Sequence, residues 1–160
     1  MADITVSIAD GASKTFPEGV RIADVLTELV SGKKRKATLA VRVGERLLDL
    51  AASLYTDTTI EPVSVDSEAG LDILRHSTAH VMALAVKELF GDEVKVAIGP
   101  AIEDGFYYDF DRPVPFTPED FDRIEAKMAE IAAACLPITR TEMRKDEALQ
   151  LFAGQNEQYK

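Results

Sequence analysis

The chain has few of the residues that mark secreted, crosslinked or membrane-bound proteins. Its 160 residues include one cysteine, Cys135, two histidines and no tryptophan. A single cysteine excludes an internal disulfide framework, and the first residues lack the basic start and apolar core of a secretory signal. No apolar run is long enough to cross a membrane. We therefore expect a cytoplasmic protein that does not contact membranes.

Positive charge is also scarce. The chain has 18 Lys and Arg against 28 Asp and Glu, a formal net charge of -10. This balance excludes a broad basic surface for nucleic-acid phosphates, so DNA is not expected as a partner and any RNA contact must be local. The one basic cluster consists of Lys33, Lys34, Arg35 and Lys36. We expect it to be a solvated loop, with a phosphate contact as the alternative.

The first 66 residues predict a small mixed sheet with one helix. Apolar residues alternate or cluster in strand fashion, with a hairpin signal at Asp10 and Gly11. Strands are expected at residues 4–8, 13–16, 38–43 and 58–65. Apolar residues at helical spacing predict a helix over residues 22–29. This order favours an α+β fold of the β-grasp type for a domain at residues 1–66.

A second domain is expected at residues 67–160, after a boundary rich in Pro, Ser, Asp and Gly. It should begin with a helix that ends at Gly91, followed by strands at 94–98 and 106–110. Thr117 and Pro118 predict the start of another helix. Its expected buried stripe is Phe121, Ile124, Met128, Ile131 and Cys135. A strand at 138–143 and a short helix at 146–153 complete the expected order.

The two histidines of the chain, His76 and His80, lie four residues apart in the first helix of this domain. That spacing places both imidazoles on one helix face, where they can act on the same molecule or ion. A structural role is the alternative, and zinc binding is another. Zinc proteolysis is disfavoured because Ser77 replaces the glutamate of the His-Glu-x-x-His motif. A nucleophilic Ser77 or Thr78 is disfavoured because no carboxylate is identifiably placed to orient a histidine.

Three segments carry a resemblance to a known family: Ile-Leu-Arg-His-Ser-Thr-Ala-His at 73–80, Ala-Ile-Gly-Pro at 97–100 and Gly-Phe-Tyr-Tyr-Asp at 105–109. Together they resemble the editing domain of bacterial threonyl-tRNA synthetases. The preceding segment resembles the TGS domain, a β-grasp module of the same enzymes. The closing residues 158–160 resemble an internal part of the editing domain, so the resemblance implies that residues 67–160 are its first part, truncated at the C-terminus.

The resemblance implies proofreading, in which seryl-tRNA(Thr) is hydrolysed at its aminoacylated 3′ end. It assigns His76 and His80 to the catalytic site, without deciding which is the base. Tyr108, Lys160, Gly99 and Pro100 would bind substrate or shape its pocket. In the family, a Cys and a His four residues apart complete the site. They have no equivalent here, because no histidine follows Cys135.

The resemblance also implies what this chain should not do alone. The aminoacylation domain is absent, and with it the ATP, Mg and zinc sites and the dimer interface expected in the parent enzyme. We therefore expect no cofactor and little or no editing activity in this chain. Two other hypotheses stay open. One is a TGS-based module that binds RNA or a regulatory protein, and the other is a free-standing or metal-dependent hydrolase.

Overall fold

The computed structural model describes residues 2–9, 11–155 and 159. The chain divides into two compact units, Met1–Leu74 (unit 1) and Arg75–Lys160 (unit 2), and the division falls within a long helix. Both contain helices and strands, which confirms the predicted α+β class. Among the described residues, no helix is both long and apolar enough to cross a membrane.

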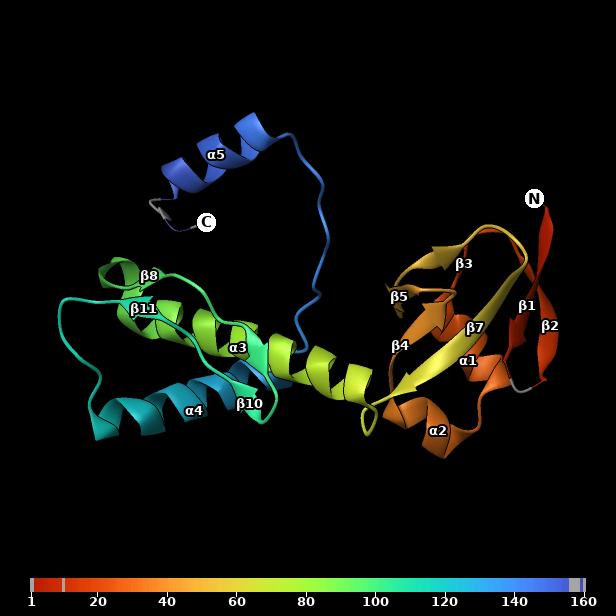
Figure 1. Ribbon diagram of the computed structural model, residues 1–160, viewed down its shortest axis with the longest axis horizontal. Helices are drawn as coiled ribbons and strands as arrows, with labels where there is room; N and C mark the ends of the chain where they lie inside the picture. Colours follow the sequence, from red (N-terminus) through yellow and green to blue (C-terminus); the bar gives the residue numbers. More distant parts are fainter. Residues whose placement is uncertain (1, 10, 156–158, 160) are drawn as a thin grey trace. The chain divides into compact units, whose positions relative to one another are not determined.

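Unit 1 is a five-stranded mixed sheet with one main helix (Figure 1). In the order of the sheet, its strands are β2 (Ser13–Pro17), β1 (Asp3–Ile8), β7 (Thr58–Ser64), β4 (Thr38–Val43) and β5 (Arg46–Asp49). The pair β1 and β7 is parallel, and the other pairs are antiparallel. The strands predicted from apolar patterning are thereby confirmed. The β-grasp assignment stays a prediction.

One face of this sheet is covered by α1 (Ile22–Leu29). Alternate residues of β1 point inward and meet the apolar side of the helix, as the period of two in a strand requires. The core consists of Ile4, Val6, Ile8, Phe16, Ile22, Val25, Leu26, Val30, Val41, Leu54 and Ile60. A short ladder of β3 (Val20–Arg21) and β6 (Ser53–Leu54), which the sequence pattern did not predict, lies beside this helix.

The basic cluster is not the loop expected from the sequence. Residues Gly32–Ala37 form a short helix, α2, in which the Arg35 N–H donates to the Ser31 carbonyl oxygen at 2.8 Å. The Thr38 hydroxyl donates to the Lys34 carbonyl oxygen at 2.9 Å and satisfies the last turn. Lys, Arg and Ala are good helix formers, and cations are favourable near a helix C-terminus. These preferences explain why the segment is helical despite its charge.

Unit 2 contains most of α3 (Glu68–Phe90), a 3₁₀ turn at Gly91–Glu93, and helices α4 (Pro118–Ala133) and α5 (Lys145–Gly154). Gly91 has a φ of 59°, which suits glycine and confirms the predicted helix stop. Between α3 and α4 the chain forms a hairpin of four short strands. They are β8 (Lys95–Val96), β9 (Ala101–Ile102), β10 (Gly105–Phe106) and β11 (Phe110–Asp111).

The hairpin is less regular than the two continuous strands expected from the sequence. β8 pairs with β11 and β9 with β10, and residues 97–100 and 107–109 interrupt the ladder. The predicted strand at 138–143 was wrong: these residues are irregular and exposed, with Ile138 85% exposed. A strand needs a hydrogen-bonded neighbour, and within the described part of the chain none pairs with this segment.

The core of unit 2 joins α3, the hairpin and α4 through Val86, Val94 and Ile124. The predicted stripe on α4 is only partly confirmed. Ile124 and Ile131 are buried, but Phe121 is 55% exposed. Cys135 lies past the end of α4 in a turn, with a φ of 47°, and is exposed because its backbone no longer follows the helix. Cys135 is therefore not a core residue of these units.

Candidate functional site

The helix that carries both histidines begins at a tightly fixed turn. The Ser67 hydroxyl donates to the Ser64 carbonyl oxygen at 2.7 Å, and its Oγ accepts the Gly70 N–H at 3.1 Å. This arrangement satisfies one of the free N–H groups at the start of α3. Gly70 passes so close to the Ser64 carbonyl oxygen that a Cβ atom would lie 1.9 Å from it. The start of α3 is thus set by backbone proximity to the end of β7.

His76 and His80 contact each other directly on α3. Their Nε2 atoms are 3.0 Å apart, and the ring centroids are 4.6 Å apart with an interplanar angle of 83°. Both side chains are exposed. A hydrogen bond at this distance requires one Nε2 to carry a proton and the other to accept it, so it depends on the tautomers of the two rings. The structure therefore brings the two predicted catalytic residues together, as their spacing required, while their role stays a prediction.

This geometry allows one proton to be shared by the two rings. A second proton would place two N–H donors against each other, so the hydrogen-bonded pair exists only while one Nε2 is unprotonated. A neutral imidazole of this kind can accept a proton from water or hold a water molecule in orientation. The pair is chemically suited to hydrolysis, and it is also suited to binding a cation.

Gly99 and Tyr108 form the second contact among the predicted site residues. A Cβ atom on Gly99 would lie 2.1 Å from Tyr108 Cδ2 and 2.6 Å from Tyr108 Cγ. The ring therefore lies against bare backbone, which only glycine permits here. Pro100 follows in the same irregular segment, half-buried. This contact gives a physical reason for glycine at position 99, at the point where the hairpin ladder is interrupted.

Tyr108 also borders an apolar cavity of about 680 Å³ between α3, the hairpin and α4. Its ring stacks on Phe110 with centroids 5.1 Å apart. The other lining residues are mostly aromatic or aliphatic: Met82, Val86, Phe106, Phe116, Phe121, Ile124 and Met128, with Asp109 and Glu125 at the polar side. Neither histidine borders this cavity. The structure thus places Tyr108 and the histidine pair in the same unit but not in one pocket.

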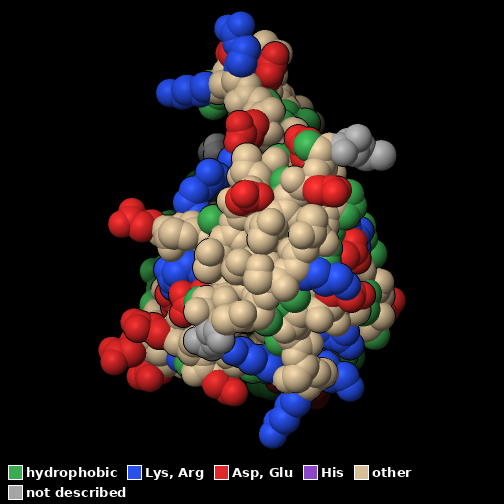
Figure 2. Space-filling model, turned by 90° about the vertical axis from the view of Figure 1, so that its right-hand side faces the viewer, with side chains coloured by type: hydrophobic (Ala, Val, Ile, Leu, Met, Phe, Trp, Pro, Cys, Tyr) green, Lys and Arg blue, Asp and Glu red, His purple; other side chains and the backbone are tan. Residues whose placement is uncertain are grey.

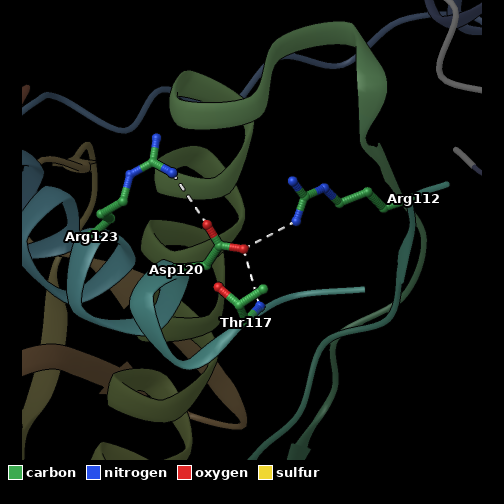
Figure 3. Close-up of polar contacts among 4 residues, drawn as sticks. All are labelled: Arg112, Thr117, Asp120 and Arg123. Carbon is green, nitrogen blue, oxygen red and sulfur yellow. Dashed lines mark hydrogen bonds and ion pairs between the residues drawn. The ribbon is translucent and has the colours of Figure 1, made fainter. Parts of the chain in front are cut away.

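A charged network at the start of α4 has no counterpart in the sequence predictions (Figure 3). Asp120 is buried and accepts the Thr117 backbone N–H at 3.1 Å, Arg112 Nη1 at 3.3 Å and Arg123 Nη1 at 3.2 Å. The hydrogen bond from Thr117, and then the two guanidinium groups, hold the pKa of Asp120 below its usual range, although burial acts in the opposite direction. The sequence pattern indicated Thr117 as an N-cap, but it gave no indication of the two arginine partners.

Arg112 is held by rings as well as by Asp120. Its guanidinium carbon lies 4.2 Å from the Phe90 centroid and 4.9 Å from the Phe116 centroid. Its Nε atom is buried without a hydrogen-bond partner among the described residues. This position makes Arg112 the link between the end of α3, the segment before α4, and α4 itself. No local pattern in the sequence indicates such a long-range contact.

The remaining predicted site residues lie elsewhere or outside the described residues. Lys33, Lys34 and Lys36 are exposed on α2 in unit 1, and Arg35 is half-buried. On the face drawn in Figure 2, Lys and Arg side chains lie at the bottom and lower right, and Asp and Glu side chains at the lower left. Lys160 lies outside the described residues. Among those that are described, no group of three or more His, Cys, Asp or Glu is arranged to hold a metal ion.

Comparison with known proteins gives the chain a family context. No family model matches it. The threonine–tRNA ligase of Pelobacter propionicus is 46% identical over 160 residues, which is 100% of this chain and 25% of that protein. Those of Nitratidesulfovibrio vulgaris (strain DP4) and Symbiobacterium thermophilum are 50% and 43% identical over 158 and 157 residues. This chain is homologous to the N-terminal region of threonine–tRNA ligases. It spans about a quarter of their length.

The homology to threonine–tRNA ligase confirms the family resemblance drawn from the motifs around His76, Gly99 and Tyr108. It extends over the whole of this chain and therefore includes both units. The relatives' names describe whole proteins about four times as long. The part of that function that belongs to this chain must therefore be argued from its own residues.

Proposed function

We propose that this chain carries the proofreading part of a threonine–tRNA ligase. Residues 1–66 are a β-grasp TGS domain, and residues 67–160 are the first part of an editing domain that acts on the aminoacylated 3′ end of tRNA(Thr). The observation that carries the proposal is the His76 and His80 pair, with Nε2 atoms 3.0 Å apart on α3, in a chain homologous to these ligases. The parallel β1 and β7 strands beside α1 support the β-grasp assignment.

A proofreading site is needed because serine and threonine differ by one methyl group. A pocket gains only about 1–3 kcal/mol from such a group, or roughly 10- to 200-fold discrimination. Translation requires more than this. A second site that admits the seryl group and excludes the extra methyl of threonine supplies the missing selectivity by hydrolysing the wrong product.

The reaction is hydrolysis of the ester between serine and the terminal ribose. The water oxygen bonds to the ester carbonyl carbon, one imidazole accepts the water proton, and the bond between this carbon and the ribose oxygen breaks. The ribose oxygen then receives the proton, which leaves serine and uncharged tRNA. The other imidazole holds the water or the adenosine in place. Gly99, Pro100 and Tyr108 supply wall positions, and Lys160 a cation toward the substrate.

The test uses a chimera in which this chain replaces the matching quarter of the Pelobacter propionicus threonine–tRNA ligase. The double substitution His76→Ala His80→Ala should slow deacylation of seryl-tRNA(Thr) by about 10²- to 10⁴-fold, the usual contribution of a general base. Charging of tRNA with threonine by the same molecule should not change. This second activity is the internal control for folding and tRNA binding.

Ser77→Ala is the matched control variant, because Ser77 lies on the same helix between the two histidines. It should deacylate like the unaltered chimera, since the proposal gives its hydroxyl no catalytic role. Equal deacylation by the histidine double variant and the unaltered chimera would remove the histidines from catalysis. Loss of both deacylation and charging in the histidine variant would instead show structural damage, and single substitutions would then be compared.

A second function is supported by the α2 helix, which presents three exposed lysines from an acidic chain. Clustered cations favour phosphate contacts and release counterions on binding. Neutralising Lys33, Lys34 and Lys36 to Gln should therefore weaken tRNA binding and flatten its salt dependence. Lys14→Gln is a control, because Lys14 is paired with Glu28 at 2.7 Å away from α2. Unchanged binding at low salt would exclude an RNA contact at α2.

A further inference from the structure

The apolar cavity of unit 2 has a size that suits a small organic molecule. Its volume is about 680 Å³, and ligand sites in proteins usually measure about 300–1,000 Å³. Neither histidine of α3 borders it, and it shares only Tyr108 with the residues proposed for hydrolysis. Five of its eleven lining residues are aromatic: Phe106, Tyr108, Phe110, Phe116 and Phe121. The rings and the few polar groups beside them therefore decide which ligand it can hold.

A lining of aromatic rings favours a positively charged ligand with an apolar body. The face of each ring carries partial negative charge and attracts an ammonium or guanidinium group. The same attraction operates next to the cavity, where the guanidinium carbon of Arg112 lies 4.9 Å from the Phe116 centroid. Met82 and Met128 add polarisable sulfur atoms to the lining. The apolar part of a ligand would pack on these side chains.

The charged groups at the cavity are both carboxylates. Asp109 comes from the hairpin and Glu125 from α4, and both residues are exposed. In the described part of the chain, neither carboxylate forms an ion pair or a hydrogen bond. The described lining contains no Lys, Arg or His. A cation would therefore gain two unpaired negative partners, whereas an anion would be repelled by them and by the net charge of -10.

We propose that this cavity binds a small organic ammonium ion, primary or quaternary, with an aromatic or branched apolar substituent. The substituent packs among the rings and methionines, and the cation lies at the polar side against Asp109 and Glu125. A zwitterionic amino acid fits less well, because its own carboxylate would lie near these two. A purely apolar segment of polypeptide would leave both carboxylates without a partner. Charge complementarity thus favours a small cation as the occupant.

The test is a titration with para-tert-butylbenzylammonium of the chain labelled with carbon-13 at its methionine methyl groups. The comparison probe is para-tert-butylbenzyl alcohol, which has the same apolar body without the charge. We expect one ammonium ion per chain and a Kd at least about tenfold lower than that of the alcohol. The methyl signals of Met82 and Met128 should shift. That of Met143, which does not line the cavity, should not.

Two variants separate the contributions of charge and ring. Asp109→Asn combined with Glu125→Gln removes both charges with little change in shape, so it should weaken ammonium binding about fivefold and leave alcohol binding unchanged. Asp122→Asn is the matched control, because Asp122 is exposed on α4 and does not line the cavity. Phe121 is 55% exposed. Phe121→Leu keeps an apolar side chain without the ring and should weaken the ammonium more than the alcohol.

Equal affinity for the two probes, unmoved signals of Met82 and Met128, or equal ammonium binding by the double variant and its control would overturn the proposal. The chimera with the Pelobacter propionicus ligase tests the alternative occupant. Ammonium binding that persists in the chimera supports a ligand site, and its loss would mean that the rest of the ligase covers the cavity and would also overturn the proposal. The comparison of probes uses the unaltered chain, so it decides even if a variant misfolds.

Discussion

Alanine at position 99 should destabilise unit 2, because the added methyl group has no room beside Tyr108. A Cβ atom there would lie 2.1 Å from Cδ2, 2.3 Å from Cε2 and 2.6 Å from Cγ of the ring. Carbon atoms in contact normally lie about 3.5–4.0 Å apart. The three atoms belong to the body of the ring and not to a flexible end. The ring or the hairpin backbone must therefore move by more than about 1 Å.

The magnitude follows from three terms. Overpacking of this kind costs about 1–3 kcal/mol. Displacing Tyr108 from its stack on Phe110, with centroids 5.1 Å apart, costs about 0.5–1.5 kcal/mol. Replacing glycine restricts the unfolded chain and returns about 0.4–1 kcal/mol. The free energy of unfolding of unit 2 should therefore fall by about 2 kcal/mol in Gly99→Ala.

Hydrogen exchange read by mass spectrometry on peptides of α4 and the hairpin measures this loss separately from unit 1. Gly105→Ala is the matched control, because Gly105 lies in the same hairpin with no atom within 4 Å of its Cβ position. It should leave protection unchanged or slightly raised. In a Tyr108→Ala background, Gly99→Ala should lose its penalty and become neutral or mildly stabilising. A penalty that persists without the ring would refute the argument.

Two further predictions concern Asp120 and Gly70. The pKa of Asp120 is lowered in the folded chain, first by the Thr117 N–H and then by Arg112 and Arg123. The ionised carboxylate therefore stabilises the fold fully above the ordinary pKa of Asp, and this stabilisation is lost as the pH falls through the lowered pKa. Urea unfolding should show Asp120→Asn less stable than the unaltered chain at pH 7 and the difference vanishing in strong acid; a difference independent of pH would contradict this. Gly70→Ala should destabilise unit 1 although helix propensity alone predicts a gain of about 1 kcal/mol, because its Cβ would lie 1.9 Å from the Ser64 carbonyl oxygen. Gly32→Ala in α2, with open space at its Cβ, is the control, and higher exchange protection of β7 in Gly70→Ala would show the reasoning wrong.

The pattern of apolar residues along the sequence predicted the strands and the helix of unit 1. The alternation of Ile4, Val6 and Ile8 and the helical spacing of Val25 and Leu26 were sufficient, because these residues pack on one another. The sequence pattern gave a wrong prediction where secondary structure depends on a hydrogen-bonded partner from another part of the chain. The segment at 138–143 has strand-like residues but no strand beside it among the described residues. The run of like charges in α2 suggested a loop, although Lys, Arg and Ala are good helix formers.

Some contacts of the candidate site could likewise be predicted from the sequence, and others could not. The contact between His76 and His80 follows from a spacing of four on a helix, so the sequence was enough to predict it. The contact of Gly99 with Tyr108 joins irregular segments on the two sides of the hairpin, and the binding of Asp120 by Arg112 joins the segment after β11 to α4. The spacing of residues along one helix predicts neither contact. A resemblance to a family can name the residues, but only the fold shows that Gly99 is required by a ring.

The exposure of both imidazoles explains why hydrolysis should need more of the ligase than this chain contains. A base in open water competes with solvent for every proton, and charge on a developing oxyanion is stabilised strongly only by fixed donors in a site from which water is excluded. His76 and His80 are exposed, and neither borders the apolar cavity of unit 2. In the proposed reaction the pair would therefore transfer a proton at a site open to water. The isolated chain should therefore deacylate seryl-tRNA(Thr) far more slowly than the chimera, and equal rates would mean that the pair alone is sufficient.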